Sequence, residues 1–139
     1  MDLFLGAVFI LIAHFIADFV FQSDNMAIKK SYNIQALLLH IFVYTTTFFI
    51  MFSLYGVILN IFTIFTVSIE HWIQIGIGIS IVNGILHYIT DYCTSRIGKH
   101  YWEKEQRRNF FLTIGIDQLL HTSLLIYCYA EMLQNFGYI

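Results

Sequence analysis

Four long runs of apolar residues occupy most of this sequence, and each is at least as long as a membrane-spanning helix. Such a helix needs about 20 mostly apolar residues, and the runs cover about 3–22, 34–68, 72–92 and 110–130. The 139 residues include no proline, so no run is forced to break. Charged residues make up 12% of the chain, against about 25% in soluble domains. The sequence therefore predicts an all-α protein, a polytopic bundle of membrane helices whose outer surface contacts the lipid bilayer.

The basic residues indicate how many spans there are. All seven Lys and Arg residues fall in two segments between apolar runs, 29–30 and 96–108. Short basic loops favour the cytoplasmic side, and both reach that side only if an even number of spans separates them. The second half of the 34–68 run, from Leu54, suits a fifth span, an interfacial segment or an extended second helix. The charge rule favours four spans, with both basic loops cytoplasmic and both termini and the 54–70 region non-cytoplasmic.

A short internal repeat indicates two similar halves. The segment HFIADF beginning at His14 matches HYITDY beginning at His87, and an LLH motif ends at both His40 and His121. Parallel repeats of this kind are related by an axis along the membrane normal. The whole chain is then a single transmembrane domain of two pseudo-repeated helical hairpins, about 1–68 and about 69–139.

Seven ionisable residues lie inside the predicted spans, where charge is costly and usually faces a bundle interior. Six of them form pairs four residues apart, which places both members of a pair on one helix face. At 1.5 Å per residue they lie roughly 2–16 Å from the cytoplasmic ends of their helices, in one slab. Imidazole and carboxylate together suit zinc, manganese or iron. We therefore predict a site for one or two divalent transition metal ions, with zinc favoured. The predicted ligands are His14, Asp18, His40, His87, Asp91, Asp117 and His121.

Further roles are predicted from a residue's position in the internal repeat and from its nearness to the layer of predicted ligands. Asp117 aligns with Ala36 in the first half, so it is the predicted general base for a bound water. A guanidinium binds phosphate bidentately, which makes Arg96 a candidate at the cytoplasmic mouth. The charges interpreted as topogenic are those of Lys29, Lys30, Lys104, Arg107 and Arg108. The predicted substrate-binding residues are Arg96, Gln22, Asn83 and Gln118.

The motifs HFIADF, LLLH, GILHYITDYCTSR and FFLTIGIDQLLH resemble those of a domain-of-unknown-function family of small bacterial and phage integral membrane proteins. They are more distantly similar to inner-membrane metal-dependent hydrolases, which share His/Asp pairs on membrane helices. The resemblance implies a bacterial inner-membrane protein with a metal site at the seven residues named above. It implies no particular substrate.

The function favoured by these observations is a metal-dependent hydrolase whose site opens to the cytoplasm and acts on a phosphate ester or lipid-linked substrate. A transporter or channel for a divalent metal or protons is the first alternative, but the far half of each span has no carboxylate. Two others stay open: His–Asp pairs that only join helices, and a structural or phage accessory protein with a stabilising metal. A net charge of −2 and the lack of a basic stripe argue against nucleic-acid binding. The oligomeric state is left open.

Overall fold

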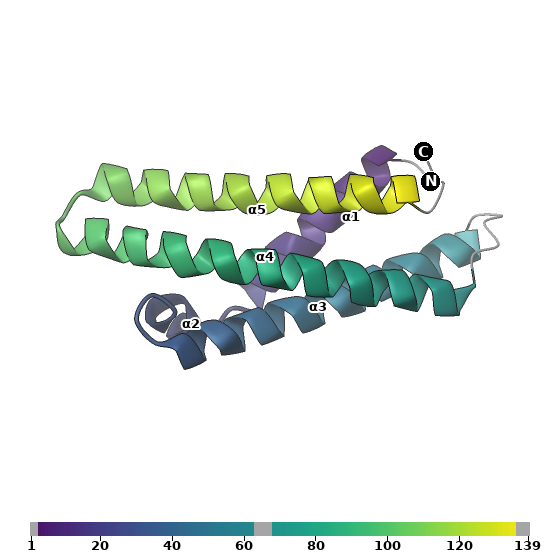
Figure 1. Cartoon of the computed structure of the whole chain (residues 1–139), viewed down its shortest axis with the longest axis horizontal. Coiled ribbons are helices and arrows are strands. Elements are labelled where there is room, and N and C mark those ends of the chain that lie inside the picture. Colours follow the sequence, from purple (N-terminus) through teal and green to yellow (C-terminus); the bar gives the residue numbers. More distant parts are fainter. Residues whose placement is uncertain (1–2, 63–67, 136–139) are drawn as a thin grey trace.

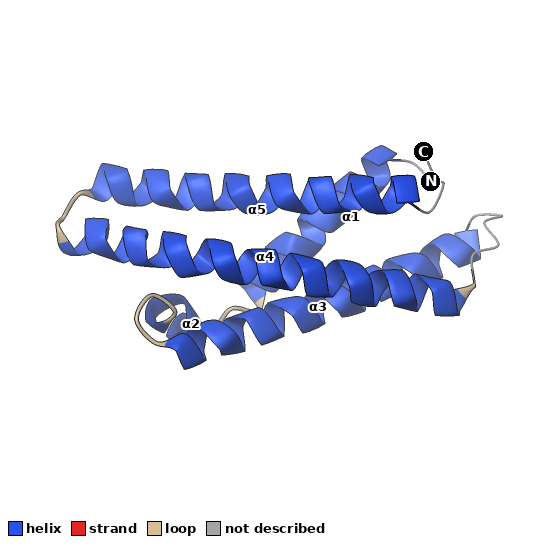
Figure 2. Ribbon diagram, in the orientation of Figure 1, coloured by secondary structure: helices blue, strands red, loops and turns tan. Residues whose placement is uncertain are grey.

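The computed structural model describes residues 3–62 and 68–135, and these residues form helices and short turns without any strand. The prediction of an all-α protein is therefore confirmed (Figures 1 and 2). In chain order the elements are α1 (Leu3–Phe15), the π-helix η1 (Ile16–Val20), α2 (Asp24–Lys29), α3 (Ile34–Phe62), α4 (Ile69–Glu103) and α5 (Arg107–Asn135).

Helix α4 extends well beyond the apolar run that predicts it. Helix α4 continues through most of the polar 96–108 segment, and the turn to α5 is only Lys104–Gln106, with Glu105 in the left-handed region at φ 57°. Charged side chains do not interrupt a helix whose backbone groups are paired, and this segment has no proline. Helix α3 runs to Phe62, so residues 54–62 extend the second helix, and 63–67 lie outside the described residues.

Within the described residues, three helical stretches are long and apolar enough to cross a membrane: Ile34–Ile61, Ile69–Glu103 and Arg107–Met132. The first apolar stretch, Phe4–Val20, is shorter. At 1.5 Å per residue it covers about 25 Å, somewhat less than the hydrocarbon core of about 30 Å. The prediction of four spans therefore stays a prediction, because the first apolar helix is shorter than the other three.

Helix α4 lies between α3 and α5 and packs along both, while α1 crosses the bundle obliquely against α3 and α5 (Figure 1). Helix α2 and the α4–α5 turn lie at one end of the bundle, which we call the basic end because it carries Lys30 and Lys104. The start of α1 and the last turns of α3 and α5 lie at the opposite end (Figure 1). Both basic segments therefore occupy the same end of the molecule.

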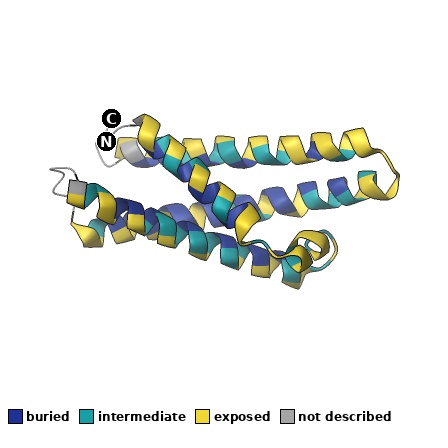
Figure 3. Ribbon diagram, turned by 180° about the vertical axis from the view of Figure 1, so that it is seen from behind, coloured by how far each residue is buried: buried dark blue, intermediate teal, exposed yellow. Residues whose placement is uncertain are grey.

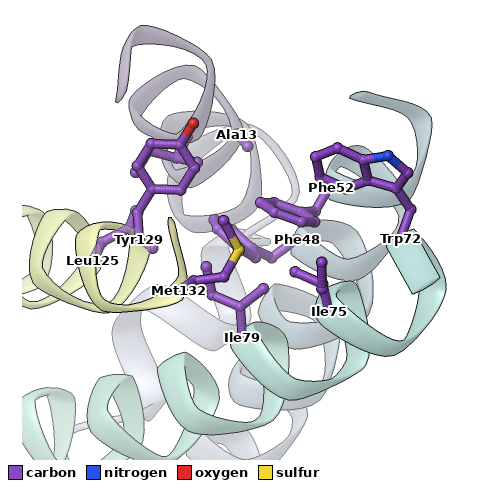
Figure 4. Close-up of a cluster of buried hydrophobic side chains, with 10 residues drawn as sticks. Ala13, Phe48, Phe52, Trp72, Ile75, Ile79, Leu125, Tyr129 and Met132 are labelled. Carbon is purple, nitrogen blue, oxygen red and sulfur yellow. The ribbon is translucent and has the colours of Figure 1, made fainter. Parts of the chain in front are cut away.

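The buried residues differ in kind between the two ends of the bundle. Towards the end opposite the basic end, a cluster of apolar side chains from α1, α3, α4 and α5 forms a tight core (Figure 4). In the half nearer the basic end, the buried residues are mainly histidine, aspartate and threonine. Exposed residues follow the outer faces of the helices (Figure 3), where large apolar side chains such as Phe42, 67% exposed, and Phe111, 65% exposed, are frequent. Such an outer surface suits lipid better than water.

Helices α3 and α4 approach closely near the end opposite the basic end. A Cβ atom added at Gly56 would lie 2.7 Å from the Trp72 indole and 3.0 Å from its Cβ. Small residues allow this kind of contact between membrane helices, where dispersion contacts rather than water exclusion hold helices together. Gly56 thus helps to set the separation at which α3 and α4 can bring their polar residues together.

Candidate metal centre

The first carboxylate of the site lies on a distorted helical turn. Helix α1 becomes the π-helix η1 at Ile16–Val20, and Asp18, 3% exposed, lies in its middle. The Gln22 side chain donates a hydrogen bond of 2.9 Å to the Asp18 carbonyl oxygen, which satisfies a backbone acceptor of this turn. Single π-helical turns are frequent at functional sites. Here the turn directs Asp18 towards residues of α3 and α4.

Asp18, His40 and His87 form a triad of ligand atoms with the spacing of a metal site. Their atoms all lie within 4.8 Å of one another. Asp18 Oδ1 is 3.2 Å from His40 Nε2 and 3.5 Å from His87 Nε2, and the two Nε2 atoms are 3.1 Å apart. Ligands about 2.0–2.2 Å from a tetrahedral zinc ion lie about 3.3–3.6 Å from one another. The triad therefore has nearly the dimensions of one face of such a tetrahedron.

A second triad consists of His87, Asp91 and His121, so the two triads share His87. Asp91 Oδ1 lies 3.3 Å from His121 Nε2, and Asp91 Oδ2 lies 3.7 Å from His87 Nε2. Asp91 Oδ2 is also 3.1 Å from His40 Nε2. His40 thus lies between the Asp18 and Asp91 carboxylates, as expected if the two carboxylates are shared or bridging ligands.

Three buried polar atoms of the first triad lack hydrogen-bond partners within the described part of the chain. They are Asp18 Oδ1, His40 Nδ1 and His87 Nδ1. A buried, unsatisfied carboxylate oxygen costs several kcal/mol, roughly 2–7 for a neutral polar group and more for a charge. Asp18 Oδ1 is nevertheless aimed at two imidazole nitrogens. The donor set of two imidazoles and a carboxylate therefore fits a divalent cation, which would satisfy this oxygen directly.

His14 lies at the edge of the cluster. Its Nε2 is 3.9 Å from Asp18 Oδ2 and 3.4 Å from Gln118 Oε1, and its Nδ1 is 3.0 Å from the Tyr44 hydroxyl. It is not a member of either triad. With its nitrogens shared between Tyr44 and Gln118, His14 is placed to support Asp18, and its predicted role as a ligand stays a prediction.

Asp117 lies at the opposite edge and is also outside both triads. Its Oδ1 accepts a hydrogen bond from Thr94 Oγ1 and lies 3.4 Å from His121 Nε2, while its Oδ2 accepts from Gln118 Nε2 at 3.1 Å. The Asp117 side chain is 15% exposed, against 1% for Asp91. Asp117 is thus the more accessible carboxylate, as a general base needs to be.

A cavity of 630 Å³ adjoins the cluster at the basic end of the bundle. Its walls come from η1, the α2 segment, the second half of α4 and the first half of α5. Asp18, Asp91 and Asp117 line it, whereas the histidines of the two triads do not. The carboxylates therefore separate the imidazole nitrogens from the open space, so a bound ion would be reached from the carboxylate side.

Lys30 enters the site although its charge was interpreted as topogenic. Its Nζ donates a hydrogen bond of 2.8 Å to Asp91 Oδ2, and the residue lines the cavity. Ser23 caps α2 by accepting a hydrogen bond from the Met26 amide, and this short helix returns the chain towards α4. Such a contact depends on how α2 folds back, so residue spacing along the sequence holds no signal for it.

Tyr44 and Thr94 were also missed as parts of the site. The Tyr44 ring stacks on His87 with 3.8 Å between ring centroids, and its hydroxyl accepts a 2.7 Å hydrogen bond from Asn83. Thr94 holds Asp117, as described above. Tyr44 lies four residues after His40, and Thr94 lies three residues after Asp91. Residues at these spacings share a helix face, so the spacing from a predicted ligand is the sequence signal that could have identified Tyr44.

The four predicted substrate-binding residues lie in different places. Gln22 and Gln118 line the cavity. Asn83 is buried behind the histidines, against Tyr44. Arg96 is not part of the cavity wall: its guanidinium lies 3.6 Å from the centre of the Tyr92 ring and donates to the Tyr92 carbonyl. The cations in the cavity lining are Lys30 and Lys99, and the interpretation of Arg96 as the phosphate-binding group gains no support from this arrangement.

Comparison with known proteins identifies a family without an assigned activity. No curated protein and no solved structure matches the chain. The sequence model of the family described as "Protein of unknown function (DUF3307)" matches residues 7–138, which is nearly the whole chain. The seven candidate ligands, the π-helical turn and the cavity all fall within the matched region. This chain belongs to the DUF3307 family of proteins of unknown function.

Proposed function

We propose that this protein is a membrane-embedded, metal-dependent hydrolase that acts on a phosphate ester or a lipid-linked substrate at the basic end of its bundle. The observation that carries the proposal is the position of Asp18 and Asp91. Each belongs to a triad with metal-ligand spacing, and each also lines the 630 Å³ cavity. A purely structural metal site closes its shell with protein ligands, whereas here the ligand set borders an open space.

Five residues would hold the metal: Asp18, His40 and His87 in one triad, and His87, Asp91 and His121 in the other. Zinc is the favoured ion for this mixture of imidazole and carboxylate, with manganese and iron as alternatives. When bound, such an ion lowers the pKa of water and polarises the group under attack. The shared His87 favours a single ion, or two ions held close together.

Asp117 is the proposed general base. Hydrolysis joins the oxygen of water to phosphorus and breaks the bond between phosphorus and the alcohol oxygen. Asp117 would accept one proton from the attacking water, and the alcohol oxygen would receive that proton as it leaves. Thr94 and Gln118 both donate hydrogen bonds to the Asp117 carboxylate, which holds it in one orientation at the cavity wall.

Two hairpins of the same orientation, crossing the membrane four times, form the proposed topology. Equivalent contacts in the two halves support it. The distance between partners four residues apart is 3.9 Å for His14–Asp18 and 3.7 Å for His87–Asp91. The distance from each aspartate to the histidine of the next helix is 3.2 Å for Asp18–His40 and 3.3 Å for Asp91–His121. We place the basic end on the cytoplasmic side, because short basic loops are retained there.

Transport of a metal or protons is less well supported. A conduit needs polar groups from one end to the other. Beyond Tyr44, the described interior is filled by the apolar cluster that includes Phe48, Phe52 and Leu125, each 0% exposed. A plug of this kind is consistent with a pocket that opens at one end.

The test is turnover by purified protein reconstituted with zinc, assayed on panels of phosphate monoesters, phosphate diesters and lipid-linked phosphates. Hydrolysis should disappear with EDTA and return with zinc. Asp117→Asn should reduce the rate by about 10²–10⁴-fold, the usual contribution of a general base. Asp24→Asn, at an exposed aspartate on α2, is the matched control and should leave the rate unchanged. Zinc-loaded protein that turns over no member of the panels would contradict the proposal.

A further inference from the structure

The cavity has two kinds of wall, and together they indicate what kind of molecule it holds. The polar part of the lining includes the three aspartates, Lys30, Lys99, Glu103 and Gln22. The other is apolar and aromatic, and it includes Phe19, Ile28, Trp102, Phe110 and Ile114. A ligand that satisfies both walls has a polar group at one end and a hydrocarbon part at the other.

The polar wall offers unused hydrogen-bonding capacity. In the described part of the chain Lys30 donates one hydrogen bond, to Asp91, and an ammonium group has three N–H donors. Ser95 Oγ and Gln22 Oε1 are buried at the cavity and have no hydrogen-bond partner among residues 3–62 and 68–135. The Ser95 hydroxyl and the Lys30 ammonium are donors that suit phosphate oxygens, and Gln22 Oε1 is an acceptor for a hydroxyl of the same head group.

The cavity has room for a long hydrocarbon chain. If each water-sized group takes about 30 Å³, 630 Å³ accommodates roughly 20 such groups, which matches a phosphate with one long chain. Trp102 and Phe110 pack edge to face, with 4.9 Å between ring centroids, and present an aromatic surface at the cavity wall. Tryptophan, whose ring is amphipathic, is typical of the membrane–water boundary, where a chain would enter from the bilayer.

We propose that the cavity binds a single-chain lipid phosphate, an alkyl or isoprenyl phosphate, with its phosphate against Lys30 and its chain along the Trp102, Phe110 and Ile114 wall. This proposal rests on the proposed function, because three aspartates face the same space. Their charge repels an anion until a divalent cation is bound beside them. Metal should therefore strengthen binding of the phosphate but not binding of the chain.

The experiment measures binding of three probes to full-length protein in a non-ionic detergent, by native mass spectrometry and thermal shift. The probes are hexadecyl phosphate, hexadecanol and inorganic phosphate, each tested with zinc-loaded and EDTA-treated protein. Zinc-loaded protein should bind hexadecyl phosphate at least about 10-fold more tightly than hexadecanol, because hydrogen bonds to charged groups contribute this much or more. EDTA should remove that preference.

Two matched pairs of variants locate the head group and the chain. Lys30→Gln should lose about 10-fold or more of the affinity for hexadecyl phosphate, whereas Lys29→Gln, at the exposed neighbour, should not change it. Lys30→Arg, which keeps the charge next to Asp91, should retain most of the affinity. Gly98→Leu should weaken binding of both alkyl probes, because a Cβ there makes only ordinary contacts at 3.8 Å and its side chain would enter the cavity. Gly115→Leu, on an open face of α5, is its control.

The outcomes separate this inference from the proposed function, because metal content is measured in the same samples. Protein that takes up zinc but binds hexadecanol as tightly as hexadecyl phosphate would overturn the lipid-phosphate site alone. Equal effects of Lys30→Gln and Lys29→Gln would also overturn it. Inorganic phosphate that binds as tightly as hexadecyl phosphate would show that the chain contributes nothing. Failure to bind zinc would instead contradict the proposed function.

Discussion

The Nε2 atoms of His40 and His87 lie 3.1 Å apart, although the two residues belong to different helices and are 47 positions apart in the chain. Both atoms face Asp18 Oδ1 from the η1 turn. One of the two nitrogens can donate a hydrogen bond to the other, but His40 Nε2 also lies 3.1 Å from Asp91 Oδ2 and 3.2 Å from Asp18 Oδ1. A single N–H hydrogen cannot serve all of these acceptors, whereas one cation between them can. This contact therefore joins three helical elements at one point and favours a shared ion over simple polar pairing.

The first prediction concerns metal content. Zinc-reconstituted protein should hold one to two equivalents of the ion by elemental analysis. His87→Ala should lose most of it because His87 is common to both triads, and the loss should exceed the roughly 10–100-fold typical of residues that only support ligands. His100→Ala, at an exposed position near the end of α4, should retain wild-type metal. Folded wild-type protein that stays metal-free under these conditions would contradict the site.

The second prediction separates the two kinds of aspartate. Asp18→Asn should lose both metal and thermal stability, because Asp18 is buried and belongs to a triad. Asp117→Asn should remain folded and at least partly metallated, because Asp117 is more accessible and outside both triads. Metal analysis and melting temperature on the same preparations provide the comparison. Equal losses in the two variants would assign Asp117 to the metal-binding framework instead of catalysis.

The third prediction concerns topology. In a variant with Cys93 and Cys128 replaced, single cysteines introduced at Lys29 and Lys104 should react with a membrane-impermeant reagent only after lysis. A cysteine at Glu70, near the start of α4 and exposed, should react in intact cells. Both basic positions lie at the same end of the bundle, so labelling of only one of them from outside would refute the four-span arrangement.

The fourth prediction concerns helix packing. Gly56→Ala should destabilise the protein by about 1–3 kcal/mol, the usual cost of overpacking, because the new Cβ would lie 2.7 Å from the buried Trp72 indole. Gly78→Ala on α4 meets no atom within 4 Å and should be neutral or stabilising by up to about 1 kcal/mol, from helix propensity. Denaturant titration in detergent compares the two. Similar stabilities would mean that the α3–α4 contact relaxes without cost.

The sequence alone was sufficient to predict the all-helical architecture and the residues that gather inside it. Long apolar runs without proline predict helices, in which the backbone satisfies its own hydrogen bonds. The four-residue spacing of His14 and Asp18, and of His87 and Asp91, places each pair on one face. Their similar depth in separate helices indicates one shared level. These are local properties of a helix, and they need no knowledge of how helices pack.

Tertiary structure decided which of these residues come within ligand distance and what surrounds them. Nothing in the apolar pattern of residues 3–22 marks the π-helical turn, which packs against α3 and brings Asp18 Oδ1 within 3.2 Å of His40 Nε2 and 3.5 Å of His87 Nε2. Lys30 reaches Asp91 only because α2 folds back against the bundle, and Arg96 turns away onto Tyr92. The distances between side chains on different helices depend on the packing of every intervening residue. Periodicity along one helix carries no information about those distances, so the cavity and its charge became visible only in the folded chain.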